Sequence, residues 1–288
     1  MNDLMNNIKN LREMTGAGFL DCKKALEEND NNLDKSVDFL RKKGLAKANK
    51  KSSRATNEGA VGIFSNNDTT SIIQINTETD FSAKNEVFLN FMEMIGNFSL
   101  ELTNTDILID DFNQMIFKEI SITDHFKSII AKIGENIVLT DLVIIKNSDT
   151  LMTSNYIHNS YRKNIGKIAV VLISDVKNIN EDAKLFGKNL CMHIAASKPL
   201  AMNIEQLDKD LIKKEKEVQL ESIKSSGKPD NIIDKILEGK MKKFYSESTF
   251  LNQQYILDTD KTVEKAILDF SEKNKFKVIS YDLIFLGS

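Results

Sequence analysis

The 288-residue sequence predicts an α+β fold with antiparallel sheets, in which a small helical segment comes first and a helical hairpin is inserted in the second half. Three observations support this prediction. Apolar residues recur at helical spacing through the first 45 residues. Strand-like runs then alternate in pairs with helix-like runs, rather than in strict β–α–β order. Two long, highly charged helical patterns flank the short segment SSGKP at residues 225–229.

The first 45 residues are predicted to form three short helices. TGAG at residues 15–18 separates the first two, Asn32 is placed to cap the third, and Gly44 is expected to end it. Their inward-facing positions are Leu4, Ile8, Leu11, Cys22, Ala25, Leu26, Leu33, Val37 and Leu40. Because so small a unit has a marginal core, we expect it to pack on a partner or on the rest of the chain. The polar, lysine-rich residues 46–58 form the best domain boundary.

The middle of the chain is predicted to mix strands and helices. GAVGIFSN (59–66) and TTSIIQIN (69–76) form an antiparallel hairpin. TETDFSAKN (77–85) follows as a polar, turn-like connection with no obvious use for an exposed Phe81 beside Asp80. The remaining elements expected here are helices at 85–102 and 122–133 and strands at 136–146, 151–158 and 165–174.

The last third is predicted to be mainly helical. A helix starts near residue 181 and ends at Pro199. Helices over 204–224 and 230–244 form an antiparallel hairpin, whose charged outer face and narrow apolar stripe suit an arm that packs on another surface. A helix near 262–273 and the strand KVISYDLIF complete the chain.

Composition limits the class of protein. The net charge is −3, and no apolar run reaches the ~18–20 residues of a membrane span. The N-terminus lacks the pattern of a secretory signal, so Cys22 and Cys191 are expected to be reduced, buried thiols in a cytoplasmic protein. Lysine-rich stretches such as KANKKSSR (47–54) are balanced by acids elsewhere, which favours solvated helix faces over a nucleic-acid surface.

Clustered reactive groups, the usual mark of an enzyme, do not stand out in the sequence. His125, His158 and His193 are far from one another and from the cysteines, and no pair has the spacing of a zinc site. SGKP lacks the upstream glycine and the Ser or Thr of a phosphate-binding loop. We therefore expect no catalytic residues, no bound metal and no cofactor, and we expect His193 to be a structural histidine on a helix face.

Several segments together resemble one family, elongation factor Ts, the guanine-nucleotide exchange factor of elongation factor Tu. LREMTGAGFLDCKKAL (11–26) is similar to the opening signature of that family, and TDFSAKN (79–85) to its central motif. The other similar segments, in the family's order, are AKIGENI (131–137), MHIAASKP (192–199), SGKP, EGKMKKFYSE (238–247) and QQYILDTDKTV (253–263). So many motifs in the right order make the resemblance highly specific.

The resemblance implies an architecture and a function. Residues 1–54 correspond to a ubiquitin-associated-like three-helix domain. Residues 55–145 and 146–288 correspond to two α+β core subdomains, the second with a helical hairpin at about 200–245 that relatives use for dimerisation. Members bind the GDP complex of elongation factor Tu, loosen its Mg²⁺ and phosphate contacts, and stabilise the nucleotide-free GTPase until GTP enters. Whether this chain forms a homodimer through the hairpin stays open.

The resemblance also assigns residues. Thr79, Asp80, Phe81 and Ser82 match the central motif, whose phenylalanine inserts near the Mg²⁺ site of the GTPase while the aspartate biases the contacts to the ion. The residues that match the N-terminal docking surface are Arg12, Phe19 and Leu20. For the last two, the alternative is that one, more readily Leu20, is part of the core. His158 matches a family histidine that either contacts the partner or supports a turn.

The sequence departs from the family pattern at three places. Ser82 stands where valine is common, which is expected to weaken apolar support beside Phe81. The segment HNSYRKNIGKIAVV, which starts at His158, is altered and longer than usual. The chain ends at LIFLGS, and we expect it to lack the helical tail that some relatives use for further partner contacts.

Two functions of other classes compete with nucleotide exchange. A general interaction module would bind through residues 1–54 alone and would not need residues 77–85. An RNA-binding protein would use the lysine-rich stretches, and its affinity would fall steeply with salt. The net charge of −3 argues against the RNA-binding alternative.

Overall fold

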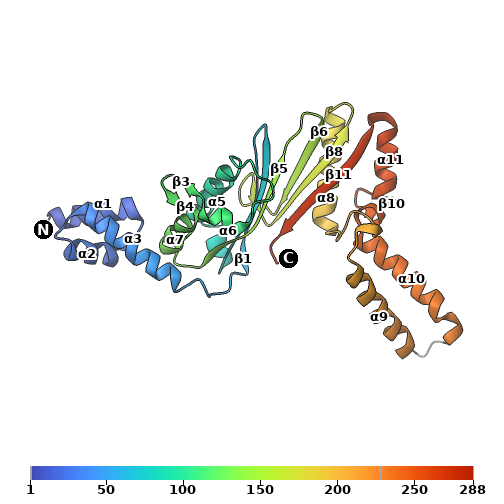
Figure 1. Cartoon of the computed structure of the whole chain (residues 1–288), viewed down its shortest axis with the longest axis horizontal. Helices are drawn as coiled ribbons and strands as arrows, with labels where there is room; N and C mark the ends of the chain where they lie inside the picture. Colours follow the sequence, from blue (N-terminus) through green and yellow to red (C-terminus); the bar gives the residue numbers. More distant parts are fainter. Residues whose placement is uncertain (1, 227–228, 288) are drawn as a thin grey trace. The chain divides into compact units, whose positions relative to one another are not determined.

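The computed structural model describes residues 2–226 and 229–287 and has the predicted α+β fold. Figure 1 labels its helices and strands. The backbone divides into two compact units. The first unit consists of Met1–Asn147, Asn159–Ile168 and Ile284–Ser288, and the second of Ser148–His158 and Ala169–Leu283. No helix within the described residues is both long enough and apolar enough to cross a membrane.

Three helices open the first unit: α1 (Asn2–Thr15), α2 (Phe19–Glu28) and α3 (Leu33–Asn49). The Asn32 side chain caps α3 as predicted, by accepting a hydrogen bond from the backbone N–H of Lys35. The small core that the three helices share contains Ile8, Leu11, Cys22, Ala25, Leu26 and Leu40. The helical periodicity of the sequence therefore identified this core correctly.

Helix α3 does not end at Gly44, and that prediction is wrong. The helix continues to Asn49, and Ala48 is buried in the core of the neighbouring sheet. Gly44 is a packing position: a Cβ atom there would lie 2.9 Å from the Cβ of Ala131 on helix α7 (Ile122–Ile133). The missing side chain lets α3 approach α7 closely, and the alanines that follow Gly44 favour continued helix.

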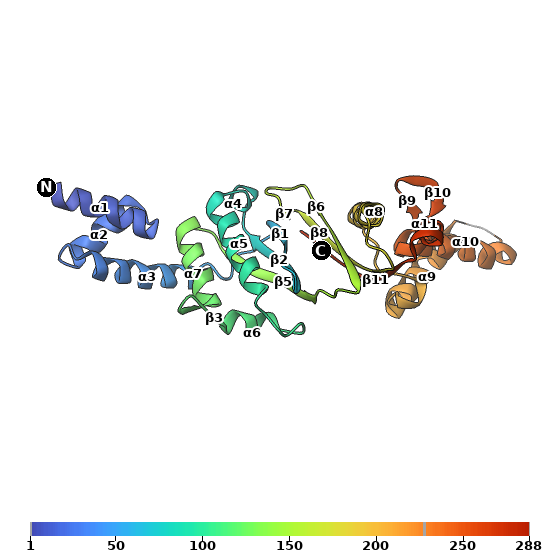
Figure 2. The ribbon, with the colours of Figure 1, turned by 90° about the horizontal axis from the view of Figure 1, so that it is seen from above.

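A four-stranded antiparallel sheet forms the centre of the first unit, with the order β5-β2-β1-β7. The predicted hairpin is present as β1 (Glu58–Ser65) and β2 (Thr69–Thr77), and β5 (Ile137–Lys146) lies beside β2. Helices α5 (Glu86–Ser99) and α7 pack on one face of this sheet through a shared apolar core (Figure 2). This core contains Phe64, Ile73, Phe88, Met92, Ile95, Phe126 and Ile130 among others.

Four short elements of the first unit were not predicted. TETDFSAKN contains helix α4 (Asp80–Ala83), so it is more than a turn-like connection. Helix α6 (Ile109–Gln114) and the two-residue strands β3 (Ile116–Phe117) and β4 (Ile120–Ser121) lie between α5 and α7. Elements of two to six residues carry too few periodic positions to be recognised from a pattern.

The predicted strand at 165–174 is two strands in two sheets. β7 (Ile165–Gly166) pairs with β1 in the first unit. β8 (Ile168–Val176) is the middle strand of the second unit's sheet, which has the order β11-β8-β6. Lys167 lies between the two strands, and their backbone pairing places them in different sheets. The outer strands are β6 (Leu151–His158) and β11 (Phe276–Phe285).

Helices accompany this sheet in the second unit. Helix α8 (Glu181–Ser197) packs closely on β6, because a Cβ atom at Gly187 would lie 2.2 Å from Ser154 Oγ. A 3₁₀ turn (Ile204–Gln206) comes before the hairpin, so its first helix, α9 (Lys209–Ser225), starts later than predicted. Its second helix is α10 (Asp230–Ser248), and residues 227–228 of the predicted SSGKP turn lie outside the described residues.

The hairpin helices α9 and α10 lie side by side (Figure 1) and share an apolar stripe of Ile223, Ile233, Leu237 and Met241. The short strands β9 (Gln254–Tyr255) and β10 (Asp258–Thr262) and the helix α11 (Val263–Asn274) complete the second unit. The narrow stripe that the charge pattern predicted is therefore buried between the two helices of the hairpin.

Candidate functional site

The segment Glu78–Ala83, called the Phe81 turn below, carries the most exposed large apolar residue among the described residues. The ring of Phe81 is 83% exposed, whereas Ser82 and Ala83, which follow it on α4, are buried. Successive side chains on a helix point about 100° apart, so α4 can present Phe81 outward while its next two residues face the protein. The structure therefore keeps this ring in solvent on a turn whose other side is packed.

Thr79 caps the start of α4. Its backbone is extended (φ −129°, ψ 155°), and its hydroxyl accepts a hydrogen bond from the Ser82 N–H at 3.3 Å. A single helical turn gains too little from its own hydrogen bonds to be stable in water. Contacts from elsewhere in the fold must therefore hold the Phe81 turn.

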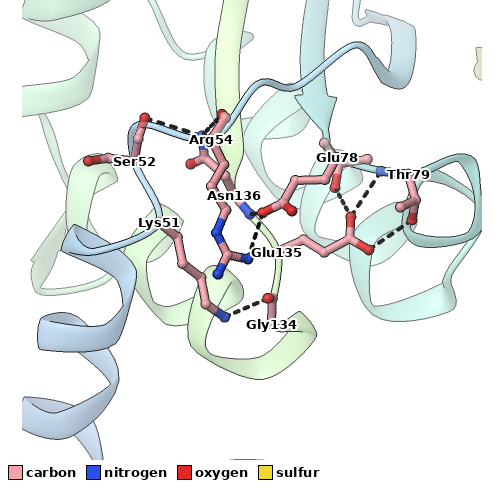
Figure 3. Close-up of polar contacts among 9 residues, drawn as sticks. Lys51, Ser52, Arg54, Glu78, Thr79, Gly134, Glu135 and Asn136 are labelled. Atoms are coloured by element: carbon pink, nitrogen blue, oxygen red, sulfur yellow. Dashed lines mark hydrogen bonds and ion pairs between the residues drawn. The ribbon is translucent and has the colours of Figure 1, made fainter.

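Glu135 supplies those contacts (Figure 3). Its Oε2 accepts hydrogen bonds from the Thr79 N–H and the Thr77 hydroxyl, both at 3.0 Å, and its Oε1 accepts one from the Thr79 hydroxyl at 2.8 Å. The Ser82 side chain also contributes to lowering the pKa of this carboxylate. Partial burial alone would raise the pKa of Glu135, but the bonds from Ser82, Thr79 and Thr77 together hold it below its ordinary value.

The position of Ser82 changes the role expected of a serine in this motif. The sequence predicted that a serine here weakens the apolar support of Phe81. In the structure Ser82 is only 8% exposed, and its backbone N–H donates to the hydroxyl of Thr79, which in turn donates to Glu135. The serine is therefore packed against the protein on the inner side of α4.

The residues beside Glu135 fasten the segment that follows α3. The backbone N–H of Asn136 donates to Glu78 Oε1 at 2.6 Å, and its side-chain amide donates to the Arg54 carbonyl at 2.8 Å. Lys51 Nζ donates to the carbonyl of Gly134 (Figure 3). The turn of residues 134–136 is thus bonded on one side to the Phe81 turn and on the other to residues 51–54.

Asp80 forms an exposed ion pair with Lys84, with Oδ2 and Nζ 2.8 Å apart. The hydrogen bond from Lys84 is the main reason that the pKa of Asp80 lies below its ordinary value. Exposed pairs of this kind are weak, because water competes for both charges. A binding partner could therefore replace Lys84 at the Asp80 carboxylate at little cost.

Leu20 is not part of the core, and the alternative that placed it there is wrong. Leu20 is 78% exposed and Phe19 is 40% exposed at the start of α2. The buried face of α2 carries Cys22, Ala25 and Leu26. Leu20 precedes Cys22 by two positions, about 200° around the helix, and so it points away from this face.

Two grooves bring the predicted site residues of the first unit near each other. Arg12, Phe19 and Gly16 line one groove of about 490 Å³ in the N-terminal helices. Gly16 also lines a second groove of about 300 Å³ together with Phe81 and Ser82. The left-handed backbone of Gly16 (φ 68°) favours glycine, and the loop there lies against Lys132 of α7. The loop after α1 is thus shared by the two predicted contact regions.

His158 belongs to the second unit. It is exposed at the end of β6, and its Nδ1 lies 3.0 Å from the hydroxyl of Tyr156. The two side chains therefore form an exposed polar pair that could meet another molecule.

The predictions that His193 is a structural histidine and that Cys22 and Cys191 are buried thiols are confirmed. His193 is fully buried on α8, where its Nε2 lies 2.9 Å from Gln253 Oε1 and its Nδ1 accepts from the Ile256 N–H at 3.3 Å. Burial lowers the pKa of His193. Cys22 and Cys191 are free, buried thiols whose pKa is raised by burial. Over the described ranges, no three His, Cys, Asp or Glu side chains gather as metal ligands would.

Sequence reasoning missed Glu135 as a functional candidate. The residue lies directly after Gly134, the left-handed glycine that ends α7, and two positions before the residue of β5 that pairs with Thr77. A correct strand register would have placed it beside Thr79. That register depends on a pairing between residues about 60 positions apart, which a local pattern does not contain.

Comparisons with known proteins agree with the motifs. The family model described as Elongation factor TS matches residues 78–288. Curated relatives named Elongation factor Ts include a protein of Sinorhizobium fredii, 39% identical over 262 residues that cover 90% of this chain and 84% of the relative. Others come from Allorhizobium ampelinum, 38% identical with the same coverage, and Bartonella henselae, 38% identical over 91% of this chain and 85% of the relative.

Proposed function

This chain belongs to the elongation factor Ts family of translation elongation factors, and from that premise we propose that it is the nucleotide exchange factor of elongation factor Tu. It binds the GTPase in its GDP complex, displaces Mg²⁺, promotes release of GDP and stabilises the nucleotide-free form until GTP enters. It performs no chemistry of its own, and it acts in the cytoplasm, where translation takes place.

Exchange makes a definite energetic demand. A GTPase that holds GDP with nanomolar affinity stabilises the complex by about 12 kcal/mol. An exchange factor must therefore bind the empty GTPase far more tightly than the GDP form, and by linkage GDP weakens the factor's binding by the same ratio. A rigid group that fits only the rearranged nucleotide site meets this demand, whereas a mobile group loses conformational entropy on binding.

The exposed Phe81 ring on a hydrogen-bonded turn is the observation that carries the proposal. The ring is 83% exposed, while Ser82 and the Glu135 contacts hold the backbone beneath it. Inserted between side chains near the Mg²⁺ site of the partner, it would gain about 1.5–3 kcal/mol from burial. Asp80 would exchange its exposed bond with Lys84 for polar groups of the partner, and Thr79 would keep the turn in place.

The N-terminal helices provide the second contact in this proposal. Arg12, Phe19 and Leu20 dock on the nucleotide-binding domain of elongation factor Tu, and His158 of the second unit makes a separate contact. Exposed apolar side chains such as Leu20, rimmed by polar residues, are typical of docking surfaces. A homodimer through the α9–α10 hairpin is a further proposal, which sedimentation of the free protein tests directly.

Release of a fluorescent GDP analogue from elongation factor Tu, followed by stopped flow, tests the proposal. We expect the wild-type protein to accelerate release, and we expect Phe81→Ala to abolish most of the acceleration while the circular dichroism spectrum stays unchanged. Ile116→Ala is the matched control, because it truncates another exposed apolar side chain of the first unit, 66% exposed on β3. Unchanged release with Phe81→Ala would show that Phe81 does not have the assigned role.

A further inference from the structure

The direction of the Phe81 side chain depends on a backbone that α4 cannot hold by itself. The helix has four residues, and Phe81 is the second of them. Its ring extends into solvent, so packing around the ring does not fix it. The orientation of α4 as a body must therefore come from the packing of its buried residues, Ser82 and Ala83, and from the residues that anchor its first turn.

Glu135 anchors that turn at its first position. It accepts from both the backbone N–H and the hydroxyl of Thr79, the residue that caps α4. A carboxylate with two oxygens can satisfy these donors and Thr77 at once, and charge-assisted bonds are stronger than neutral ones. Bonds to both groups of Thr79 restrict the rotation of the cap as well as its position.

The anchor itself is held by regular structure. Glu135 lies between the left-handed Gly134 that ends α7 and the first residue of β5, Ile137. The adjacent Asn136 is bonded to Glu78 and Arg54. A carboxylate on a short connection between a packed helix and a paired strand has little freedom, which suits a positioning role.

We propose that Glu135 is a positioning residue that fixes the start of α4 and thereby the direction in which Phe81 projects. The importance of this direction for GDP release rests on the proposed function, whereas the restraint on the Phe81 side chain does not. Ser82 takes part in the same restraint through its backbone N–H, which donates to the Thr79 hydroxyl.

The restraint can be measured without any partner, because the sequence contains no tryptophan. In the Phe81→Trp protein the indole is the only one in the molecule, and its time-resolved fluorescence anisotropy reports its local motion. We expect Glu135→Ala in this background to increase the amplitude of nanosecond depolarisation. Glu135→Gln keeps one oxygen that accepts hydrogen bonds, and its amide N–H can donate to the oxygen of the Thr79 hydroxyl. We therefore expect Glu135→Gln to restore most of the restraint.

The native Phe81 background gives the functional measurement. We expect Glu135→Ala to lower the maximal rate of GDP release at saturating factor by about tenfold, the loss expected when several hydrogen bonds to a partly buried carboxylate are removed. The factor concentration at half-maximal rate should change less, because Leu20 and its neighbours still dock. Glu101→Ala, at an exposed carboxylate after α5, is the control and should change neither quantity.

The outcomes separate the two levels of the proposal. The positioning role would be overturned if Glu135→Ala left the depolarisation of the Phe81→Trp protein unchanged and, in the native background, gave the same release rate as the Glu101→Ala control. A wild-type protein that fails to accelerate GDP release would overturn the proposed function, while the anisotropy still decides the restraint. If Glu135→Ala does not fold, Glu135→Asp replaces it: the charge remains, the side chain is one methylene shorter, and increased indole motion is again the supporting result.

Discussion

The close approach of α3 and α7 at Gly44 leads to a prediction opposite to the usual effect of replacing a helical glycine. Gly44→Ala normally stabilises a helix by about 1 kcal/mol, because alanine is the better helix former. Here the new Cβ would lie 2.9 Å from the Cβ of Ala131. Carbon atoms in contact prefer about 3.5–4.0 Å, so the two methyl groups would overlap by about 0.6 Å or more.

The overlap is costly because neither methyl group can rotate away. Each is attached directly to the backbone of a helix, and only separation of α3 from α7 relieves the contact. Overpacking of this kind costs about 1–3 kcal/mol. After the gain in helix propensity is subtracted, we expect a net loss of about 1 kcal/mol in the free energy that holds α3 against α7. This loss corresponds to roughly a fivefold increase in the population in which the two helices have separated.

Hydrogen–deuterium exchange of peptides from each element is the suitable assay, because a chain of two units need not unfold in one step. Gly44→Ala should speed exchange in α3 and α7. Gly239→Ala is the matched control: it lies inside α10 with no atom within 4 Å of its Cβ position, and it should slow exchange in α10. If Gly44→Ala protects α3 as much as Gly239→Ala protects α10, the packing argument is wrong.

Two further predictions concern a surface residue and a buried histidine. Leu20→Asp should weaken binding to elongation factor Tu by about tenfold or more in titration calorimetry, since it puts a charge where apolar contact is proposed; equal affinity would remove Leu20 from the interface. Burial lowers the pKa of His193, so the unfolded chain binds the proton more readily than the folded one. Stability of α8 should therefore fall as the pH drops below about 6.5, the ordinary value of the free side chain, until the lower folded pKa is reached. In hydrogen–deuterium exchange of α8, His193→Gln should reduce the dependence of stability on pH. The same change at the exposed His158 should leave the pH dependence of α8 as it is in the wild-type protein.

The sequence alone determined the class of the fold and the order of its main elements. Helices α1, α2, α5, α7 and α8, the β1–β2 hairpin and the strand β6 all follow from periodicity and turn residues, because each spans enough positions to show its period. The series of motifs from TGAG and TDFSAKN to QQYILDTDKTV, in the family's order, indicated the family. The sequence also predicted that His193 is a structural histidine on a helix face and that Cys191 is a buried thiol, and both are buried on α8.

Only the tertiary structure decided what depends on contacts between distant segments. Gly44 has the sequence signature of a helix end, and the neighbouring Ala131 makes it a packing position instead. The apolar side chain of Leu20 fits both a core position and a docking surface, so its residue type does not decide between them. The start of α2 at Phe19 determines that Leu20 faces solvent. Glu135 reaches Thr79 across 56 positions because β5 pairs with β2. A local pattern records which way a side chain points on its own element, but the partner it meets is set by how the elements pack.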